Sequence, residues 1–125
     1  MSGLRFTPDH EWLRAEADGT ATLGITHYAQ EQLGDVVFVE LPEPGRRFAA
    51  GDELAVIESV KAAGDVKAPA AGDVVAVNGA LAAAPELLNK DPMGEGWMVR
   101  IRLADAGALA AMMDQAAYDQ LIAGL

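Results

Sequence analysis

The sequence contains no cysteine, and this absence excludes several kinds of chemistry at once. A chain without cysteine has no disulfide, no thiolate metal ligand and no cysteine nucleophile, so sulfur chemistry has to arrive on a cofactor. Serine is nearly as scarce, since only Ser2 and Ser59 occur. Ser59 lies in the string IESVKA and not in the G-x-S-x-G turn of serine hydrolases. We therefore expect neither a cysteine nor a serine hydrolase.

Histidine and phosphate-binding motifs are also poorly represented. The two histidines, His10 and His27, have no second ligand or triad partner at a local spacing, so we interpret them as surface or capping residues and expect no metal. Gly94 and Gly96 form a GxG string without the strand and helix context of a dinucleotide site, and we interpret it as a turn. Because the chain has so few residues of the types that catalyse reactions, its sequence favours a binding or carrier function over catalysis.

Basic residues number nine against nineteen acidic ones, which gives a formal net charge of −10. Such a charge repels phosphate backbones and anionic lipid surfaces, so we expect neither nucleic acid nor a membrane as partner. The uncharged run over 74–85 is far shorter than the roughly 18 apolar residues of a membrane helix. The amino terminus shows no apolar run behind a basic stretch, so no secretory signal is visible. We expect a soluble, cytoplasmic protein.

The chain of 125 residues suits one domain, which we place over 1–125 with a core at about 6–103 and a helical segment at 104–125. Thirteen glycines and six prolines divide the sequence into short pieces, which favours a mainly β fold. We expect strands over 10–17, 20–25, 36–41, 53–60, 64–67, 73–78 and 97–103. Asp18 and Gly19 predict a two-residue hairpin turn between the first two strands. Thr26 caps a short predicted helix through Gln32, which Gly34 stops.

The last predicted strand and the tail have different patterns. The strand alternates two sets of side chains, namely Trp97, Val99, Ile101 and Leu103 against Met98, Arg100 and Arg102. This alternation predicts one exposed face. After Leu103 the apolar residues follow helical spacing, and Asp114 is placed to begin a second segment. We expect one or two amphipathic helices packed on the sheet.

Lysine is the informative residue, because only Lys61, Lys67 and Lys90 occur. Lys61 lies between an extended segment over 54–60 and a second one beginning near Asp65, with small residues at 62–64 available for a tight reversal. This placement predicts an ammonium group at a hairpin tip, where a modifying enzyme can reach it. From geometry alone, Lys61 is either an ordinary solvated lysine or a site of covalent attachment.

Several strings, in this order, resemble the glycine cleavage system H proteins, a family of lipoyl carriers. They are FTPDHEWL at 6–13, GIT and YAQEQLGDVVFVELPEPG within 24–45, ESVKAA at 58–63 and DPMGEGWMVRI at 91–101. The resemblance implies a lipoyl-domain-like barrel-sandwich hybrid of two small sheets with short helices. It also implies lipoate in amide linkage to Lys61. The residues that a lipoylating enzyme would recognise are then Glu58, Ser59, Val60, Ala62 and Ala63.

The resemblance implies a non-catalytic carrier that works with three enzymes and is a monomer when free. Lipoate receives an aminomethyl group from a pyridoxal-phosphate glycine decarboxylase and presents it to a tetrahydrofolate-dependent aminomethyltransferase. A flavin-dependent dihydrolipoyl dehydrogenase then reoxidises the dithiol. The family is thought to fold the loaded arm back onto its surface, and the matching candidates for holding the amine are Asp9, Glu11 and Asp65. The alternative for these three is ordinary surface charge.

Three residues depart from the family pattern without touching Lys61. His27 stands where Asp is common, Gly64 where Ser is usual and Met93 where Tyr is frequent. We expect Gly64 to loosen the turn, and His27 and Met93 to alter contacts of partners or of the arm.

Three other functions remain as alternatives at the level of sequence. The first is a lipoyl relay protein that donates lipoyl groups to 2-oxo acid dehydrogenase acyltransferases. The second is a biotinyl carrier, although that family flanks its lysine with methionines where this chain has Val60 and Ala62. The third is a small unmodified enzyme acting at His10, Glu11 and Asp65, which lacks a nucleophile, a metal set and a phosphate loop.

Overall fold

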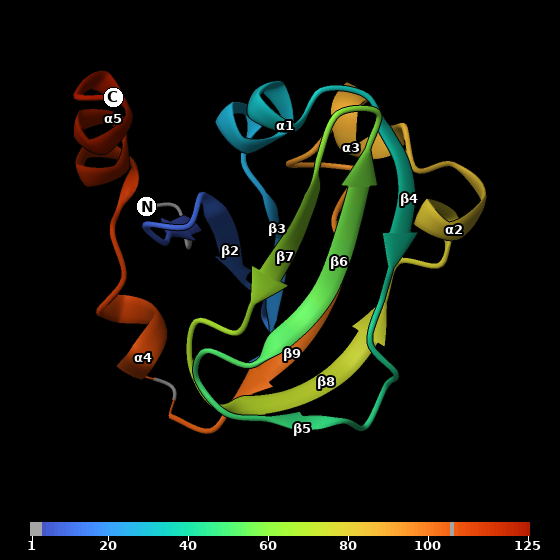
Figure 1. The fold of residues 1–125 in the computed structure, drawn as a ribbon. Helices are drawn as coiled ribbons and strands as arrows, with labels where there is room; N and C mark the ends of the chain where they lie inside the picture. Colours follow the sequence, from blue (N-terminus) through green and yellow to red (C-terminus); the bar gives the residue numbers. More distant parts are fainter. Residues whose placement is uncertain (1–3, 106) are drawn as a thin grey trace.

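The computed structural model describes residues 4–105 and 107–125, and it consists mainly of two antiparallel sheets (Figure 1). The larger sheet has the order β1 (Leu4–Phe6), β2 (Glu11–Ala15), β3 (Ala21–Ile25), β9 (Val99–Leu103), β8 (Gly72–Val77) and β5 (Arg47–Phe48). The smaller sheet has the order β4 (Val36–Glu40), β6 (Glu53–Ser59) and β7 (Ala63–Lys67). The mainly β, two-sheet expectation is confirmed.

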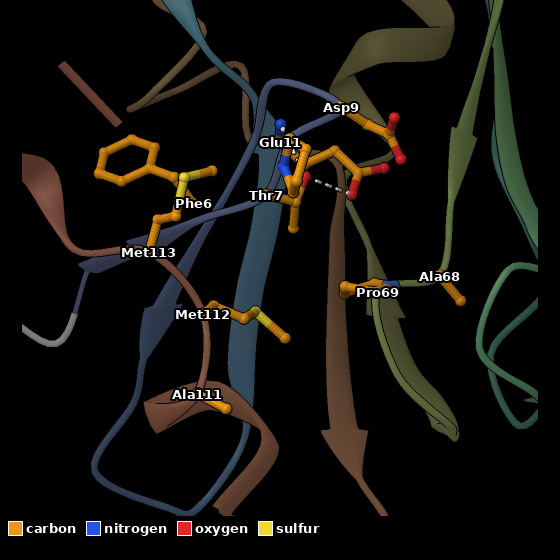
Figure 2. A pocket seen from close by; sticks show the side chains of 10 residues that line it. Phe6, Thr7, Asp9, Glu11, Ala68, Pro69, Ala111, Met112 and Met113 are labelled. Atoms are coloured by element: carbon orange, nitrogen blue, oxygen red, sulfur yellow. Dashed lines mark hydrogen bonds between the residues drawn. The ribbon is translucent and has the colours of Figure 1, made fainter. Parts of the chain in front are cut away.

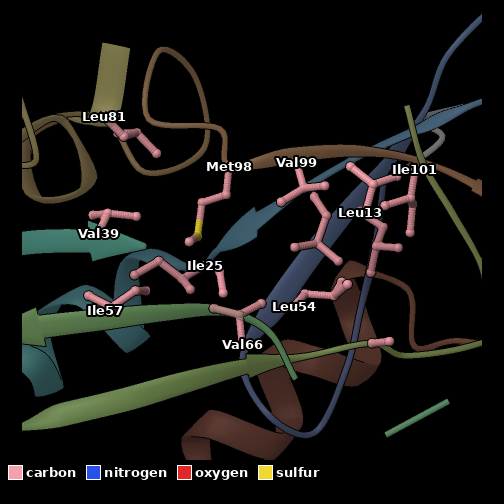
Figure 3. Packing of buried hydrophobic residues seen from close by; sticks show 14 of the residues in the cluster. Leu13, Ile25, Val39, Leu54, Ile57, Val66, Leu81, Met98, Val99 and Ile101 are labelled. Atoms are coloured by element: carbon pink, nitrogen blue, oxygen red, sulfur yellow. The ribbon is translucent and has the colours of Figure 1, made fainter. Parts of the chain in front are cut away.

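The hydrophobic core lies between the two sheets, and side chains from both meet in it (Figure 3). Leu13 and Leu23 of the larger sheet and Ile57 of the smaller one are almost completely buried. Met98 is also fully buried, so the expectation that it lies on an exposed face is wrong. The reason is that β9 begins only at Val99, and Met98 therefore stands outside the alternation of that strand.

The hairpin between β2 and β3 has a longer turn than the two residues that we expected from Asp18 and Gly19. The backbone N–H of Glu16 donates to the carbonyl of Thr20 at 2.8 Å, so three residues form the loop. Gly19 has a φ of 87°, and a residue in this left-handed region is what closes a three-residue hairpin loop. The Asp18 carboxylate accepts from the backbone N–H and the hydroxyl of Thr20.

The predicted short helix is confirmed as α1 (His27–Leu33). Thr26 Oγ1 accepts the backbone N–H of Ala29 at 3.2 Å, and Gly34 ends the helix with a φ of 78°. Sequence patterns missed the strands β1 and β5 and the one-turn helices α2 (Ala80–Ala83) and α3 (Leu87–Lys90). Each of these two helices buries one leucine in the core, and four residues are too few to show a periodic pattern.

Two helices in the tail confirm the helical expectation for this segment. They are α4 (Gly107–Ala110) and α5 (Gln115–Ala123), and the Asp114 carboxylate caps α5 by accepting the backbone N–H of Ala117. Ala106, within the predicted helical segment, lies outside the described residues. Just before α5, Phe6 and Met113 exchange two backbone hydrogen bonds, so the tail is tied to β1. Throughout 4–105 and 107–125, no helix has the length and apolar character needed to cross a membrane.

Candidate functional site

Lys61 lies at the tip of the β6–β7 hairpin, at the same end of the molecule as α1 and α3 (Figure 1). Its side chain is exposed, and so is the neighbouring Val60. Ser59 closes the tip through three hydrogen bonds to Ala62. Its backbone N–H and its hydroxyl both donate to the Ala62 carbonyl, and its Oγ accepts the Ala62 N–H at 3.1 Å. The reversal therefore uses residues 60–62. The strand expected over 64–67 is confirmed as β7, which begins one residue earlier, at Ala63.

The Lys61 side chain lies along the backbone of Gly34. A Cβ atom built on Gly34 would stand 3.1 Å from Lys61 Cε, so a side chain here would press on the lysine. Asn89 of α3 fixes this backbone, since its Nδ2 donates to the carbonyl of Gly34 at 2.9 Å and its Oδ1 accepts the N–H of Val36 at 2.8 Å. No sequence pattern indicated this role of Asn89, because its partners lie more than fifty residues away.

A cleft of about 200 Å³ lies beside the hairpin tip. Its walls are apolar side chains from both sheets and from α1, with polar groups among them; they are Ile25, Ala29, Leu33, Ile57 and Val66, together with Asp9, His10, Gln32, Gly64 and Asp65. Gly64 lies three residues after Lys61, and a Cβ built on it would touch Leu33 Cδ2 at 3.6 Å. The cleft thus starts close to the lysine, and the glycine at 64 keeps its wall open.

Asp9 and Asp65 come together at this cleft. Both also line an adjoining polar hollow of about 260 Å³, where Lys67 is the third residue. Asp9 comes from the segment before β2 and Asp65 from β7, so the tertiary fold brings them to one place. Both side chains are exposed, and an amine entering the hollow would meet two carboxylates.

Glu11 has a different environment from these two residues, because its side chain is buried (Figure 2). Its Oε1 accepts the Thr7 hydroxyl at 3.1 Å and its Oε2 accepts the backbone N–H of Lys67 at 3.0 Å. Burial raises the pKa of the Glu11 carboxyl to about 7, against the lowering effect of these hydrogen bonds. It lines a third cavity, of about 390 Å³, with Phe6 and Met112. Ordinary surface charge is therefore the wrong description of Glu11.

His10 is partly buried and takes part in a network that sequence reasoning missed. Its Nδ1 lies 2.9 Å from the Tyr118 hydroxyl, which also lies 2.7 Å from Thr26 Oγ1. Burial lowers the pKa of the His10 imidazole below its usual value, against the raising effect of Asp9. The interpretation of His10 as a simple surface or capping histidine is wrong.

The other departures from the resembled pattern lie away from the lysine. His27 is exposed on α1, and its Nε2 stands 3.3 Å from the Glu31 carboxylate one turn later. Met93 packs against a small cluster of Phe6, Trp12 and Tyr118. Neither residue is among the cleft-lining residues.

The site contains an exposed lysine on a hydrogen-bonded hairpin tip, an apolar cleft and two carboxylates. In the described part of the chain, no three His, Asp or Glu side chains are grouped to hold a metal. Two packed sheets with a lysine at a hairpin tip define the lipoyl-domain-like barrel-sandwich class of carrier proteins.

Comparisons with known proteins identify the family. The model of the family described as Glycine cleavage H-protein matches residues 4–124. Glycine cleavage system H protein 1 of Pseudomonas aeruginosa is 62% identical over 122 residues, covering 98% of this chain and 95% of its own length. The glycine cleavage system H protein of Parvibaculum lavamentivorans is 54% identical over 125 residues, covering 100% and 99%. A crystal structure of a glycine cleavage system H protein from Mycobacterium marinum matches with a TM-score of 0.87 and 36% identity, covering 100% of this chain and 99% of that one.

The chain belongs to the glycine cleavage H-protein family. It is accordingly a lipoyl-carrier component of the glycine cleavage system and not itself a catalyst. The readings of the chain as a biotinyl carrier or as a small unmodified enzyme are set aside by this membership.

Proposed function

We propose that Lys61 holds lipoate in amide linkage at its Nζ and that this arm carries the aminomethyl group of glycine cleavage. The observation that supports this assignment is the position of Lys61, exposed on a hairpin tip that Ser59 closes and next to the start of an apolar cleft. When bound, lipoate supplies the dithiolane chemistry that a chain without cysteine lacks.

The residues of the cleft fit such a group. A lipoyl arm is a long apolar chain, and the cleft wall offers Leu33, Ile57 and Val66 to its methylenes. The loaded arm ends in an amine, and Asp9 and Asp65 stand together at the polar side of the cleft. We propose that these two carboxylates hold the amine directly. We propose that Glu11 contributes indirectly, because its carboxylate accepts the backbone N–H of Lys67, which lines the same hollow.

We propose that the residues flanking Lys61 are read by the lipoylating enzymes. Glu58, Val60, Ala62 and Ala63 are exposed around the tip and available for contact. Ser59 is half-buried and its hydroxyl is bonded within the turn, so its role is to hold the tip in shape. Small residues at 62 and 63 leave the lysine accessible from one side.

We propose that the free chain is a monomer that docks in turn on the pyridoxal-phosphate decarboxylase, the tetrahydrofolate-dependent aminomethyltransferase and the flavin-dependent dihydrolipoyl dehydrogenase. A net charge of −10 favours partner surfaces that carry basic residues. A covalent tether keeps the group at high effective concentration for each docked partner.

Mass spectrometry tests the attachment site. Protein produced together with lipoylating enzymes is expected to show one lipoyl increment, which peptide mapping assigns to Lys61. An increment on Lys67 or Lys90, or none, would contradict the assignment. Adding glycine and the decarboxylase should then produce a further aminomethyl increment on the same peptide, which distinguishes glycine cleavage from a lipoyl relay.

The arm-holding role predicts a shorter lifetime of the loaded protein in the Asp65→Asn variant. The substitution removes a charge from the hollow without changing its size, and a hydrogen bond to a charged group is worth roughly 1.5 kcal/mol or more. Ammonia release from the loaded protein, in the absence of the aminomethyltransferase, should become about tenfold faster. Glu43→Gln is the matched control, since it removes one exposed negative charge from the segment between β4 and β5 and lines none of these three cavities. An unchanged release rate in Asp65→Asn would remove Asp65 from this role.

A further inference from the structure

His10 has an unusual backbone conformation at the cleft. Its φ of 65° makes it the one non-glycine residue with positive φ in the described part of the chain. Two backbone hydrogen bonds hold it there, from His10 N–H to the Thr7 carbonyl at 3.0 Å and from Thr26 N–H to the His10 carbonyl at 2.9 Å. Strained residues of this kind persist when the surroundings fix them, and they cluster at functional sites.

The Tyr118 hydroxyl joins two walls of the cleft. One wall is the turn that carries Asp9 and His10, which the hydroxyl contacts at His10 Nδ1. The other wall is α1, whose N-cap oxygen, Thr26 Oγ1, is its second contact. The ring of Tyr28, also on α1, lies 4.6 Å from the His10 ring. The C-terminal helix α5 therefore fixes the spacing between these two walls.

One arrangement of this network, with a neutral His10, gives an acceptor to every hydroxyl proton. In this arrangement Thr26 Oγ1 accepts the Ala29 N–H and donates its own proton to the Tyr118 oxygen. The Tyr118 hydroxyl then donates to His10 Nδ1, which leaves the imidazole proton on Nε2. Every hydroxyl proton has an acceptor in this arrangement, and the tautomer and orientation of His10 are set together.

Docking of α5 does not depend on the hydroxyl. The Tyr118 ring stacks on Phe6 with centroids 4.5 Å apart and an angle of 8° between the planes. Leu121 and Ile122 pack against the same cluster. A phenylalanine at 118 would keep this packing, so the hydroxyl can be removed by itself.

We propose that Tyr118 is a positioning residue for the cleft. Its hydroxyl fixes the His10 tautomer and ties the Asp9–His10 turn to α1. The C-terminal helix thereby sets how long the arm on Lys61 remains bound in the cleft. The inference rests on the proposed arm-holding function, because the folded arm is what the cleft would retain. It adds a role for Tyr118, which lies 57 residues along the chain from Lys61.

The test uses the full chain with Tyr118→Phe and, as a matched control, Tyr28→Phe, whose hydroxyl makes none of these bonds. The first readout is the imidazole nitrogen spectrum of the unloaded protein by NMR. In the parent and in Tyr28→Phe, His10 should show a single tautomer with the proton on Nε2. In Tyr118→Phe it should become a mixture of tautomers, while His27 keeps its signals. The melting temperatures of both variants should match that of the parent, which checks that the fold is retained.

The second readout is ammonia release from the loaded protein without the aminomethyltransferase. Tyr118→Phe should release ammonia about threefold faster or more, and Tyr28→Phe at the rate of the parent. This inference alone would be overturned if the parent releases ammonia more slowly than urea-unfolded protein and Tyr118→Phe has the same release rate and the same His10 tautomer as the parent. A parent that already releases ammonia as fast as urea-unfolded protein would overturn the arm-holding function and this inference together.

Discussion

The Lys61→Arg variant is expected to fold like the parent and to lose all carriage of the aminomethyl group. The side chain is exposed at the hairpin tip, where the hydrogen bonds of Ser59 and not the lysine hold the turn. Arginine keeps the positive charge, but its guanidinium stays protonated at any accessible pH and cannot form the amide. In a reconstituted assay with glycine and the partner enzymes, activity should fall to background, and the intact mass should show no lipoyl increment.

Two other lysines provide the controls for this variant. Lys67→Arg and Lys90→Arg change the other two exposed lysines, and both proteins should be lipoylated like the parent; Lys90, which lines none of the three cavities, should also leave activity unchanged when it is replaced. Circular dichroism and melting temperature should agree among all four proteins. Glycine-dependent activity above background in Lys61→Arg would show that the arm is attached elsewhere and would reject the assignment.

Lys61 could be located from the sequence because its signal is local. Lysine is scarce, the flanking segments are β-rich, and the string around it resembles a lipoylation motif. The start of the second strand differs by one residue, because Ala63 is small enough for a turn but pairs with Glu58 in the ladder.

The surroundings of the lysine could not be predicted in the same way, because they depend on contacts between distant segments. Asn89 binds the backbone at Gly34 from a one-turn helix, which is too short to show a periodic pattern in the sequence. Tyr118 meets His10 across 108 residues, and its place in a helical stripe indicated only packing. Resemblance named Asp9 and Asp65, but their meeting in one hollow required the fold.

Glu11 also illustrates how a local pattern misleads. Its neighbour Asp9 is exposed, yet Glu11 points inward from β2 and loses its hydration. Two hydrogen bonds, from Thr7 and from the Lys67 backbone, offset only part of that loss, and the pKa of its carboxyl therefore stays raised at about 7. Asp9, which adds a nearby negative charge, raises this pKa further. The protein thus carries a carboxylate that destabilises the fold when it ionises.

This environment predicts that Glu11→Gln stabilises the protein increasingly as the pH rises from about 4.5 to about 7. The folded pKa of about 7 lies above the unfolded value near 4.5, so the contribution of neutral Glu11 is fully present below pH 4.5. It is lost as the pH rises through about 7. The difference of about 2.5 in pKa corresponds to about 3 kcal/mol in the free energy of unfolding. Glutamine is neutral at every pH and keeps an oxygen to accept the Lys67 N–H.

Urea unfolding of parent and variant at pH 4.5, 6, 7 and 8 measures the effect. The difference in unfolding free energy should be near zero at pH 4.5 and should grow in favour of Glu11→Gln to about 3 kcal/mol at pH 8. Glu53→Gln removes an exposed carboxylate from β6 and should give no such trend, which separates burial from a simple change in net charge. A difference that is constant with pH would mean that Glu11 ionises in the folded protein as it does in the unfolded chain, and that water reaches it through the cavity that it lines with Thr7 and Met112.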